Sequence, residues 1–408
     1  MKSGNRNLIL IIAGVVIVGL VLITVMLLRD TDSEDIWKDN PDITRNEEPG
    51  TNTNDADEAL GITPNDPVER LERFKKWAQY PPQSRPLTEG NVDLIDPYNA
   101  EKTPLSVIAK PGKNCKERSE GGFECEEDPV FSETKCKMTP ESSISVGKHD
   151  FRLTLYCHNN QGEKLAISNL SAKMERWFNR QRFGSLPPIS MGDDGTNGDQ
   201  KAGDKIYTIV VRTGTQDWGQ MTVTADFEVE GLKHSQRADF YSTPHIVAEF
   251  NEGGIRDSVE DGSLYIYVPV NIKKAGYYEF QANLQEAGGD KRFIAHSTVR
   301  EDFKAGPQNI RFEFFGKIIR DINVDGPYVV REIRGKRHNS PVSKAQAEAS
   351  RREGTTLTAE TTEPLWEDIE PLGKDYTTQA YTVSQFSNTE YDSEEKQRRL
   401  QFYESLTK

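Results

Sequence analysis

The sequence predicts an all-β protein in which two immunoglobulin-like β-sandwich domains follow an N-terminal transmembrane helix, with a disordered linker and tail. The first observation is an uncharged apolar run over residues 8–28. The second is a series of strand patterns between residues 128 and 335, arriving roughly every 10 to 15 residues with Gly, Pro, Asp or Asn between them. The third is the polar, acidic composition of residues 29–65 and 336–408, which cannot bury enough apolar surface to offset chain entropy.

The apolar run reads LILIIAGVVIVGLVLITVMLL, and Thr24 is its only polar side chain. At about 1.5 Å per residue it makes a helix of roughly 31 Å, enough to cross the hydrocarbon core of a bilayer. Lys2 and Arg6 precede it and acidic residues follow it, which places residues 1–7 in the cytoplasm and the rest outside. A cleaved signal peptide is the alternative, but its apolar region is usually shorter, about 7 to 15 residues, and ends in a small-x-small site. We expect a single-pass signal-anchor in the inner (cytoplasmic) membrane, with a periplasmic or extracellular ectodomain.

Four cysteines lie in one stretch of the chain: Cys115, Cys125, Cys136 and Cys157. An even, clustered set is typical of disulfides formed in an oxidising compartment. Zinc needs paired cysteines at closer spacing, which this stretch lacks. Three connectivities are open, and we predict that Cys115 bonds to Cys125 across a hairpin and Cys136 to Cys157 across adjacent strands.

Residues 66–127 are expected to form a lead-in helix, a strap and the cysteine hairpin. A helix is predicted to start with Asp66 as its N-cap. Pro67 suits the first turn, and Glu69 stands three residues after the cap, as in a capping box. The apolar stripe of this helix either packs on the first domain or binds a partner. The proline-rich stretch that follows is too rich in proline for a central strand, so it is a surface strap or a lead-in to the first sandwich.

Two groups of strand patterns predict a first sandwich over residues 128–242 and a second over residues 243–335. The stretch LSAKMERWFNR is the exception, since its composition fits either a helix or an irregular loop. Residues 336–408 are expected to be mostly disordered, with a short helix at SEEKQRRLQFYESL near the end.

A glycine-rich acidic loop is the strongest motif in the chain. Five oxygen-bearing side chains occur within 12 residues of it: Asp193, Asp194, Asn197, Asp199 and Asp204. Calcium prefers such oxygen ligands on a flexible backbone, so one interpretation is a weak calcium site. The other is a purely structural loop in which Asp and Asn side chains cap the backbone. The sequence leaves both open.

The same loop carries a resemblance to a known family. The element GDDGTNGDQKAGDKIYT, followed by strands, resembles the immunoglobulin-like modules of bacterial envelope proteins of the choice-of-anchor X type. The closing strands of those modules resemble four segments of this chain: AGYYEFQANL, FKAGPQNIRFEFFGKIIRD, DGPY and VVREI. The likeness covers roughly residues 78–335, and it implies architecture and envelope location more than activity.

Composition narrows the function classes. A formal net charge of −14 argues against binding to nucleic acid, whose phosphates need a basic face. The six histidines form no metal-binding spacing, and the sequence has no G-x-S-x-G element and no P-loop, so we predict no catalytic residues and no enzyme. We expect an envelope binding or scaffold protein with an envelope protein as its partner. The alternatives are an accessory or chaperone-like factor for an exported partner and an envelope hydrolase without a recognisable motif.

Overall fold

The computed structural model describes residues 66–99, 105–110, 113–114, 116–117, 123–124, 126–127, 130–178, 181–339 and 364–407. The predicted membrane helix over residues 8–28 and the predicted linker lie outside these ranges. Among the described residues, no helix combines the length and the apolar character needed to span a membrane. The all-β class is confirmed, because strands dominate and pair into four main sheets.

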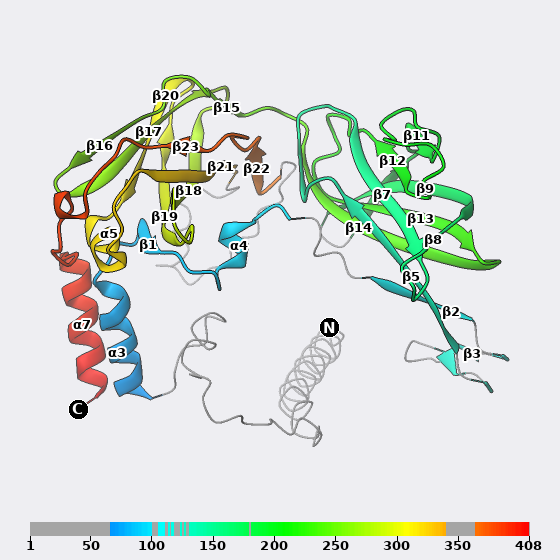
Figure 1. Cartoon of the computed structure of the whole chain (residues 1–408), viewed down its shortest axis with the longest axis horizontal. Helices are drawn as coiled ribbons and strands as arrows, with labels where there is room; N and C mark the ends of the chain where they lie inside the picture. The colour runs from blue at the N-terminus through cyan, green and yellow to red at the C-terminus, as the bar shows by residue number, and fades with distance from the viewer. Residues whose placement is uncertain are drawn as a thin grey trace, which may run out of the picture. The chain divides into compact units, whose positions relative to one another are not determined.

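The first sandwich contains a five-stranded sheet in the order β10-β9-β13-β14-β6 and a second sheet in the order β11-β12-β7-β5-β2, with β8 added to β7 (Figure 1). Its strands are β2 (Ser106–Lys110), β5 (Val130–Pro140), β6 (Ile144–Val146), β7 (Phe151–His158), β8 (Lys164–Leu165), β9 (Ile167–Phe178), β10 (Gln181–Leu186), β11 (Ser190–Gly192), β12 (Tyr207–Val211), β13 (Gly219–Val229) and β14 (Leu232–Thr243). A short hairpin, β3 (Lys116–Glu117) and β4 (Phe123–Glu124), stands apart from both sheets.

Alternation along the strands builds the core of the first sandwich. In β7, Phe151, Leu153 and Leu155 are at most 1% exposed, whereas the residues between them face solvent. Met221 and Val223 of β13 approach from the opposite sheet and belong to the same cluster. Burial of each such side chain contributes about 1.5–3 kcal/mol, so the period-two pattern is what holds the two sheets together.

The second sandwich also has two sheets. One has the order β1-β19-β18-β21-β22, and β23 pairs with β21. The other has the order β15-β17-β16, and β20 pairs with β17. The strands of the second sandwich are β1 (Ser84–Pro86), β15 (Ala248–Phe250), β16 (Arg256–Glu260), β17 (Ser263–Ile272), β18 (Gly276–Glu286), β19 (Phe293–Phe303), β20 (Gly306–Phe314), β21 (Tyr328–His338), β22 (Trp366–Ile369) and β23 (Tyr376–Thr377). The helices are α3 (Pro67–Ala78), α4 (Val92–Ile95), α5 (Gly316–Ile322), the 3-10 turn η2 (Val383–Gln385) and α7 (Glu394–Leu406).

The second sandwich draws on three distant parts of the chain. β1 pairs with β19 at one edge of the sheet, where Pro86 is tolerated because an edge strand has a free side. β2, only twenty residues further on, pairs instead with β5 of the first sandwich. β1 and β2, both in the predicted lead-in, therefore belong to different sandwiches. Asp66 caps α3 as predicted, accepting a hydrogen bond from the backbone N–H of Val68 at 2.8 Å.

The prediction of a mostly disordered tail over residues 336–408 is wrong for residues 364–407. β22 pairs with β21, and Ile369 and Phe386 are 0% and 4% exposed within the second core. The short C-terminal helix does form, as α7, and it lies beside α3 with the rings of Phe74 and Tyr403 5.1 Å apart (Figure 1). The apolar residues of the tail are isolated in the sequence, and each packs separately into a core formed mainly by other strands. A run of apolar residues is therefore not needed to order this segment.

The ambiguous stretch LSAKMERWFNR belongs to strand β9 as far as Phe178. Lys, Met, Glu and Arg favour helix locally, but β9 pairs with both β13 and β10 and buries Met174 at 1% exposure. Two sets of strand pairings thus override the local preference.

Contacts between β14 and β22 join the two sandwiches. The ring of Tyr241 stacks on that of Trp366 with centroids 4.7 Å apart, and the Tyr241 hydroxyl donates to the Trp366 carbonyl at 3.0 Å. The backbone N–H of Asp368 donates to Thr243 Oγ1 at 2.9 Å. The C-terminal strand thus connects both domains.

Candidate functional site

In the acidic loop, the carboxylates accept hydrogen bonds from the chain itself. Asp193 accepts from the backbone N–H groups of Asp204 and Lys205, at 3.2 and 2.9 Å. Asp194 accepts from the N–H and the hydroxyl of Thr196, and these hydrogen bonds lower its pKa. This is the geometry of a loop whose short acidic side chains cap the backbone.

The remaining members of the loop behave in the same way. Asp199 accepts from the N–H of Gly195 at 2.6 Å and from the hydroxyl of Thr208 at 3.1 Å, and Asp204 accepts from the N–H of Ile206. Asn197 takes a positive φ of 51°. Within the described ranges, no three His, Cys, Asp or Glu side chains converge as a metal site would require. Calcium binding by Asp193, Asp194, Asn197, Asp199 and Asp204 stays a prediction.

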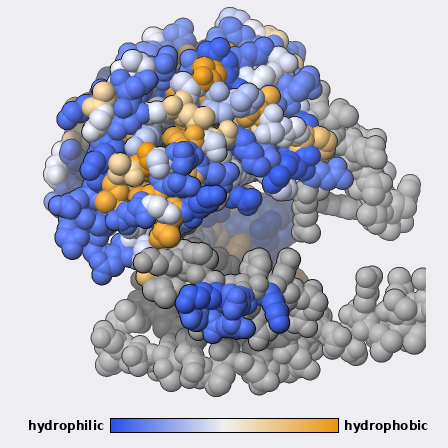
Figure 2. Space-filling model, turned by 90° about the vertical axis from the view of Figure 1, so that its right-hand side faces the viewer, coloured by the Kyte–Doolittle hydropathy of each residue, from blue (hydrophilic) through white to orange (hydrophobic). Residues whose placement is uncertain are grey.

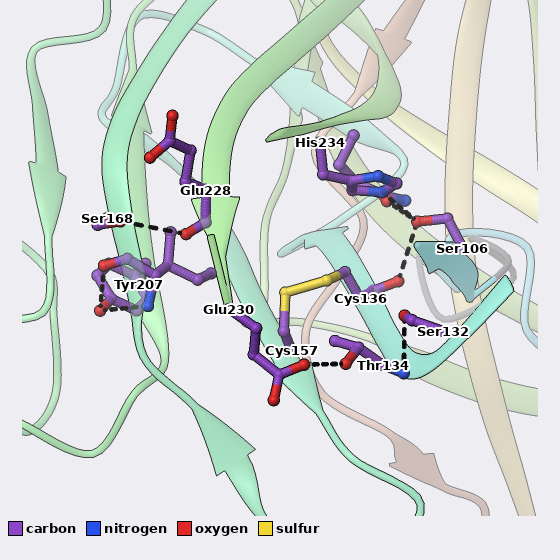
Figure 3. Close-up of a disulfide and its surroundings, with 12 residues drawn as sticks. Ser106, Ser132, Thr134, Cys136, Cys157, Ser168, Tyr207, Glu228, Glu230 and His234 are labelled. Atoms are coloured by element: carbon purple, nitrogen blue, oxygen red, sulfur yellow. Dashed lines mark hydrogen bonds between the residues drawn. A yellow bond between two sulfur atoms is a disulfide. The ribbon is translucent and has the colours of Figure 1, made fainter. Parts of the chain in front are cut away.

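The disulfide between Cys136 and Cys157 is confirmed (Figure 3). The two residues face each other on β5 and β7, with Cα atoms 4.1 Å apart, and both are fully buried. β3 and β4 form the predicted hairpin, in which Lys116 lies opposite Glu124. Cys115 and Cys125 lie outside the described residues, so their bond stays a prediction.

A serine and a histidine meet beside the disulfide (Figure 3). Ser106 Oγ of β2 lies 2.9 Å from Nε2 of His234 on β14 and also hydrogen bonds to Gln236. A nucleophilic serine would have to donate its proton to the histidine. Here the Ser106 hydroxyl has two other acceptors, Gln236 Oε1 and the Cys136 carbonyl, and a proton placed on either leaves the histidine ring as the donor. The contacts fasten β2 to β14, and we assign them that structural role.

An exposed edge of the first sandwich is the most distinctive surface. We call it the β10–β11 edge and define it as residues 181–192, which contain the terminal strands of both sheets. All six residues of β10 are exposed. Four large apolar side chains face solvent along this edge: Phe183, Leu186, Ile189 and Met191, at 40%, 37%, 53% and 42% exposure.

Arginine and aromatic side chains interleave behind this edge. The Arg176 guanidinium lies 4.7 Å from the ring centroids of both Phe183 and Trp218. Phe178 packs edge-on against Trp218 with ring centroids 5.3 Å apart. Arg182 lies 5.1 Å over the Trp177 ring and forms an ion pair with buried Glu175 at 3.2 Å. Each cation–π contact contributes about 0.5–1 kcal/mol at an exposed site, so these contacts favour the observed arrangement of the aromatic rings.

These residues form no motif that stands out in the sequence. The run RWFNRQRFGSL mixes basic and aromatic residues, but this pattern indicates a binding surface only if β10 is an edge strand.

Figure 2 shows the end of the molecule that carries the first sandwich, where hydrophobic residues interrupt a mainly hydrophilic surface.

Comparisons with known proteins assign no family. No family model matches the sequence, and no curated protein matches it. Among solved structures, a DUF4785 family protein from Legionella pneumophila is 16% identical with a TM-score of 0.39, over 62% of this chain and 58% of that one. The FdeC adhesin of Escherichia coli is 10% identical with a TM-score of 0.17, over 52% of this chain and 85% of that one. Similarities this slight support no functional statement.

Proposed function

We propose that the chain is a membrane-anchored binding protein of a bacterial-type cell envelope, which presents two immunoglobulin-like modules outside the inner membrane. The β10–β11 edge is its contact surface, and the partner is another envelope protein. The anchor is the apolar run over residues 8–28. The Cys136–Cys157 disulfide supports an oxidising compartment.

The exposure of β10 is the observation that carries the proposal. Free edge strands invite pairing with other chains, and soluble proteins normally protect them with charge, proline or a cover. β10 carries one charged residue, Arg182, which pairs with Glu175, and two prolines follow the strand. The strand itself presents Phe183 and Leu186 to solvent, with Arg176 over the Phe183 ring. A partner segment that adds as a strand would gain main-chain hydrogen bonds from the edge and specificity from these side chains.

Site-specific photocrosslinking in intact membranes tests this function. A photoreactive residue at position 183 or 189 should yield adducts with one envelope protein, and the same residue at Phe402, 58% exposed on α7, should not. Adding Leu186→Glu should reduce the adducts from position 189 at least about fivefold, because a charge at the edge opposes apolar contact. Far-ultraviolet circular dichroism serves as the folding control.

Three outcomes separate the alternatives. Adducts from position 402 but not from the edge would move the binding site to α7. Adducts with many unfolded exported proteins would favour the accessory or chaperone-like role through the same edge. The absence of adducts from every edge position would contradict the proposal.

A further inference from the structure

A small polar cavity lies between α4 with its following loop and the outer face of the second sandwich. Its volume is about 240 Å³, and its walls include Tyr98 and the charged residues Asp93, Glu279, Arg334, Lys336 and Asp368. That volume corresponds to about eight liquid waters and falls below the ~300–1,000 Å³ of drug-sized ligand sites. The cavity is independent of the β10–β11 edge, which belongs to the first sandwich.

A row of alternating charges crosses the sheet and ends at this cavity. The strand register places Arg300 opposite Glu279, Glu279 opposite Lys336, and Lys336 opposite Asp368. Glu279 takes both neighbouring cations, with Arg300 at 2.6 Å and Lys336 at 3.4 Å. Asp368 is therefore the last member of the row, and its cross-strand neighbour is already engaged.

The Asp368 carboxylate is left incompletely satisfied. The side chain is 6% exposed, and in the part of the chain that the structure describes its Oδ2 has no hydrogen-bond partner. Buried polar atoms are nearly always paired, and leaving a buried acceptor unpaired is destabilising, most of all when it is charged. The position therefore points to a donor that the chain itself does not supply.

Arg334 presents the opposite charge to the same cavity. It is 4% exposed, and its guanidinium donates to neutral acceptors: Gln281 Oε1 at 2.9 Å, the Leu94 carbonyl at 3.3 Å and the Glu332 carbonyl at 3.2 Å. Among the described residues no carboxylate forms an ion pair with it. Burial lowers its pKa, and the nearby carboxylates of Glu332, Asp93 and Glu279 partly oppose that effect without forming an ion pair.

The two charged residues are neighbours on the same face of the sheet. Arg334 lies two residues before Lys336 on β21, so it is a diagonal neighbour of Asp368, and such pairs have Cα atoms about 7–8 Å apart. Tyr98 lines the cavity with both residues. Burial raises the pKa of its hydroxyl, Asp368 raises it further, and Arg334 lowers it. Trp366, fixed by stacking on Tyr241, forms part of the wall.

We propose that this cavity binds a free α-amino acid, with the carboxylate of the ligand at Arg334 and its ammonium group at Asp368. A zwitterion of this size offers an ion-pair partner to Arg334 and a donor to the unpaired Oδ2 of Asp368. A simple cation at Asp368 would bring a second positive charge toward Arg334. A simple anion at Arg334 would bring a second negative charge toward Asp368.

Thermal unfolding of the full chain in detergent tests the proposal. L-alanine and L-glutamine are the probes, and acetate and methylammonium at equal concentration represent each half of the ligand. At about ten times Kd, either amino acid should raise the Tm by about 2–4 °C. Acetate and methylammonium should give no shift.

Asp368→Asn should abolish the shift produced by the amino acids without lowering the Tm of the free protein, because it removes a buried charge whose Oδ2 has no hydrogen-bond partner among the described residues. A purely structural Asp368 would instead lower the Tm when replaced. Tyr98→Phe should weaken the shift, and Asp302→Asn, at an exposed position of β19, should leave it intact. Equal shifts with acetate or methylammonium, or no shift with either amino acid up to about a thousandfold molar excess, would overturn the proposal and leave a water-filled cavity.

Discussion

Asp257 of β16 is the residue on which much of the C-terminal segment is fastened. It is 8% exposed, and its carboxylate accepts from the Tyr376 hydroxyl, from the Tyr381 hydroxyl at 2.6 Å and from the N–H of Gln379 at 3.2 Å. Burial together with these contacts raises the pKa of both tyrosines. Three donors on one acceptor tie a distant part of the chain to the second sandwich.

Asp257→Asn should lower the free energy of unfolding by about 2–3 kcal/mol, since hydrogen bonds to a charged acceptor are worth about 1.5–3 kcal/mol and the amide also introduces a competing donor. Tyr376→Phe removes one donor and should cost about 1 kcal/mol. Urea unfolding measures both, with Asp302→Asn as the exposed control. Equal stability of wild type and Asp257→Asn would show that the three contacts contribute nothing net.

Asp368 makes stability depend on pH. Burial raises its pKa to about 6, partly opposed by Lys336 and by hydrogen bonding from Trp366. Its stabilising effect is therefore present when the carboxyl is protonated and is lost as the pH rises through about 6. His296 acts in the opposite direction, because burial lowers its pKa to about 4, so its contribution is lost as the pH falls below the unfolded value.

Because these two effects oppose each other, the pH dependence of the wild-type unfolding free energy does not isolate Asp368. A comparison of the wild type with a variant at Asp368 does. Relative to Asp368→Asn, the wild type should gain about 2–3 kcal/mol of unfolding free energy as the pH falls from about 7 to 4, the window between the folded and unfolded pKa of Asp368. Urea unfolding at a series of pH values measures this difference. A constant difference across that window would mean that Asp368 keeps an ordinary pKa.

At the scale of elements, the C-terminal segment consists of two parts with different roles. β22 and the following residues supply Ile369, Leu372 and Phe386 to the second core. α7 buries no side chain and rests on α3. An apolar side chain in a core contributes more than one on an exposed helix pair, so the two parts should differ in their effect on stability.

Truncation after residue 363 should destabilise the second sandwich by more than about 5 kcal/mol, because three core side chains and the strand beside β21 are lost together. Truncation after residue 392 removes only α7 and should cost about 1 kcal/mol. Denaturant unfolding followed by circular dichroism compares the two. If both truncations behaved alike, β22 would not be an integral strand of the sheet.

At the scale of the whole molecule, residues 8–28 should keep the chain in the membrane. We expect the full chain to sediment with membranes and to resist extraction with alkaline carbonate, because about 20 apolar residues in a helix match the hydrocarbon thickness. A variant lacking residues 1–28 should remain in the supernatant. A full-length gene product that appears in the soluble fraction with a new N-terminus after the apolar run would identify a cleaved signal peptide instead.

Local sequence patterns fixed those features that depend on neighbouring residues. Period-two alternation predicted β7, and Asp66 predicted the start of α3, because side-chain spacing and backbone capping act over a few residues. The Cys136–Cys157 bond followed from strands that are near in sequence. The aspartates of the acidic loop were recognised as a group, but their use as backbone acceptors needed the folded loop.

Long-range pairing decided the rest. β9 is a strand because β13 and β10 pair with it, and β22 is ordered because it completes a sheet whose other strands lie far away in sequence. The β10–β11 edge and the cavity beside Asp368 also arise only when distant strands become neighbours. The sequence by itself determined the all-β class, the membrane-length apolar run and the local caps. Tertiary structure decided which residues are edges, cores and sites, because burial and pairing are properties of neighbours in space.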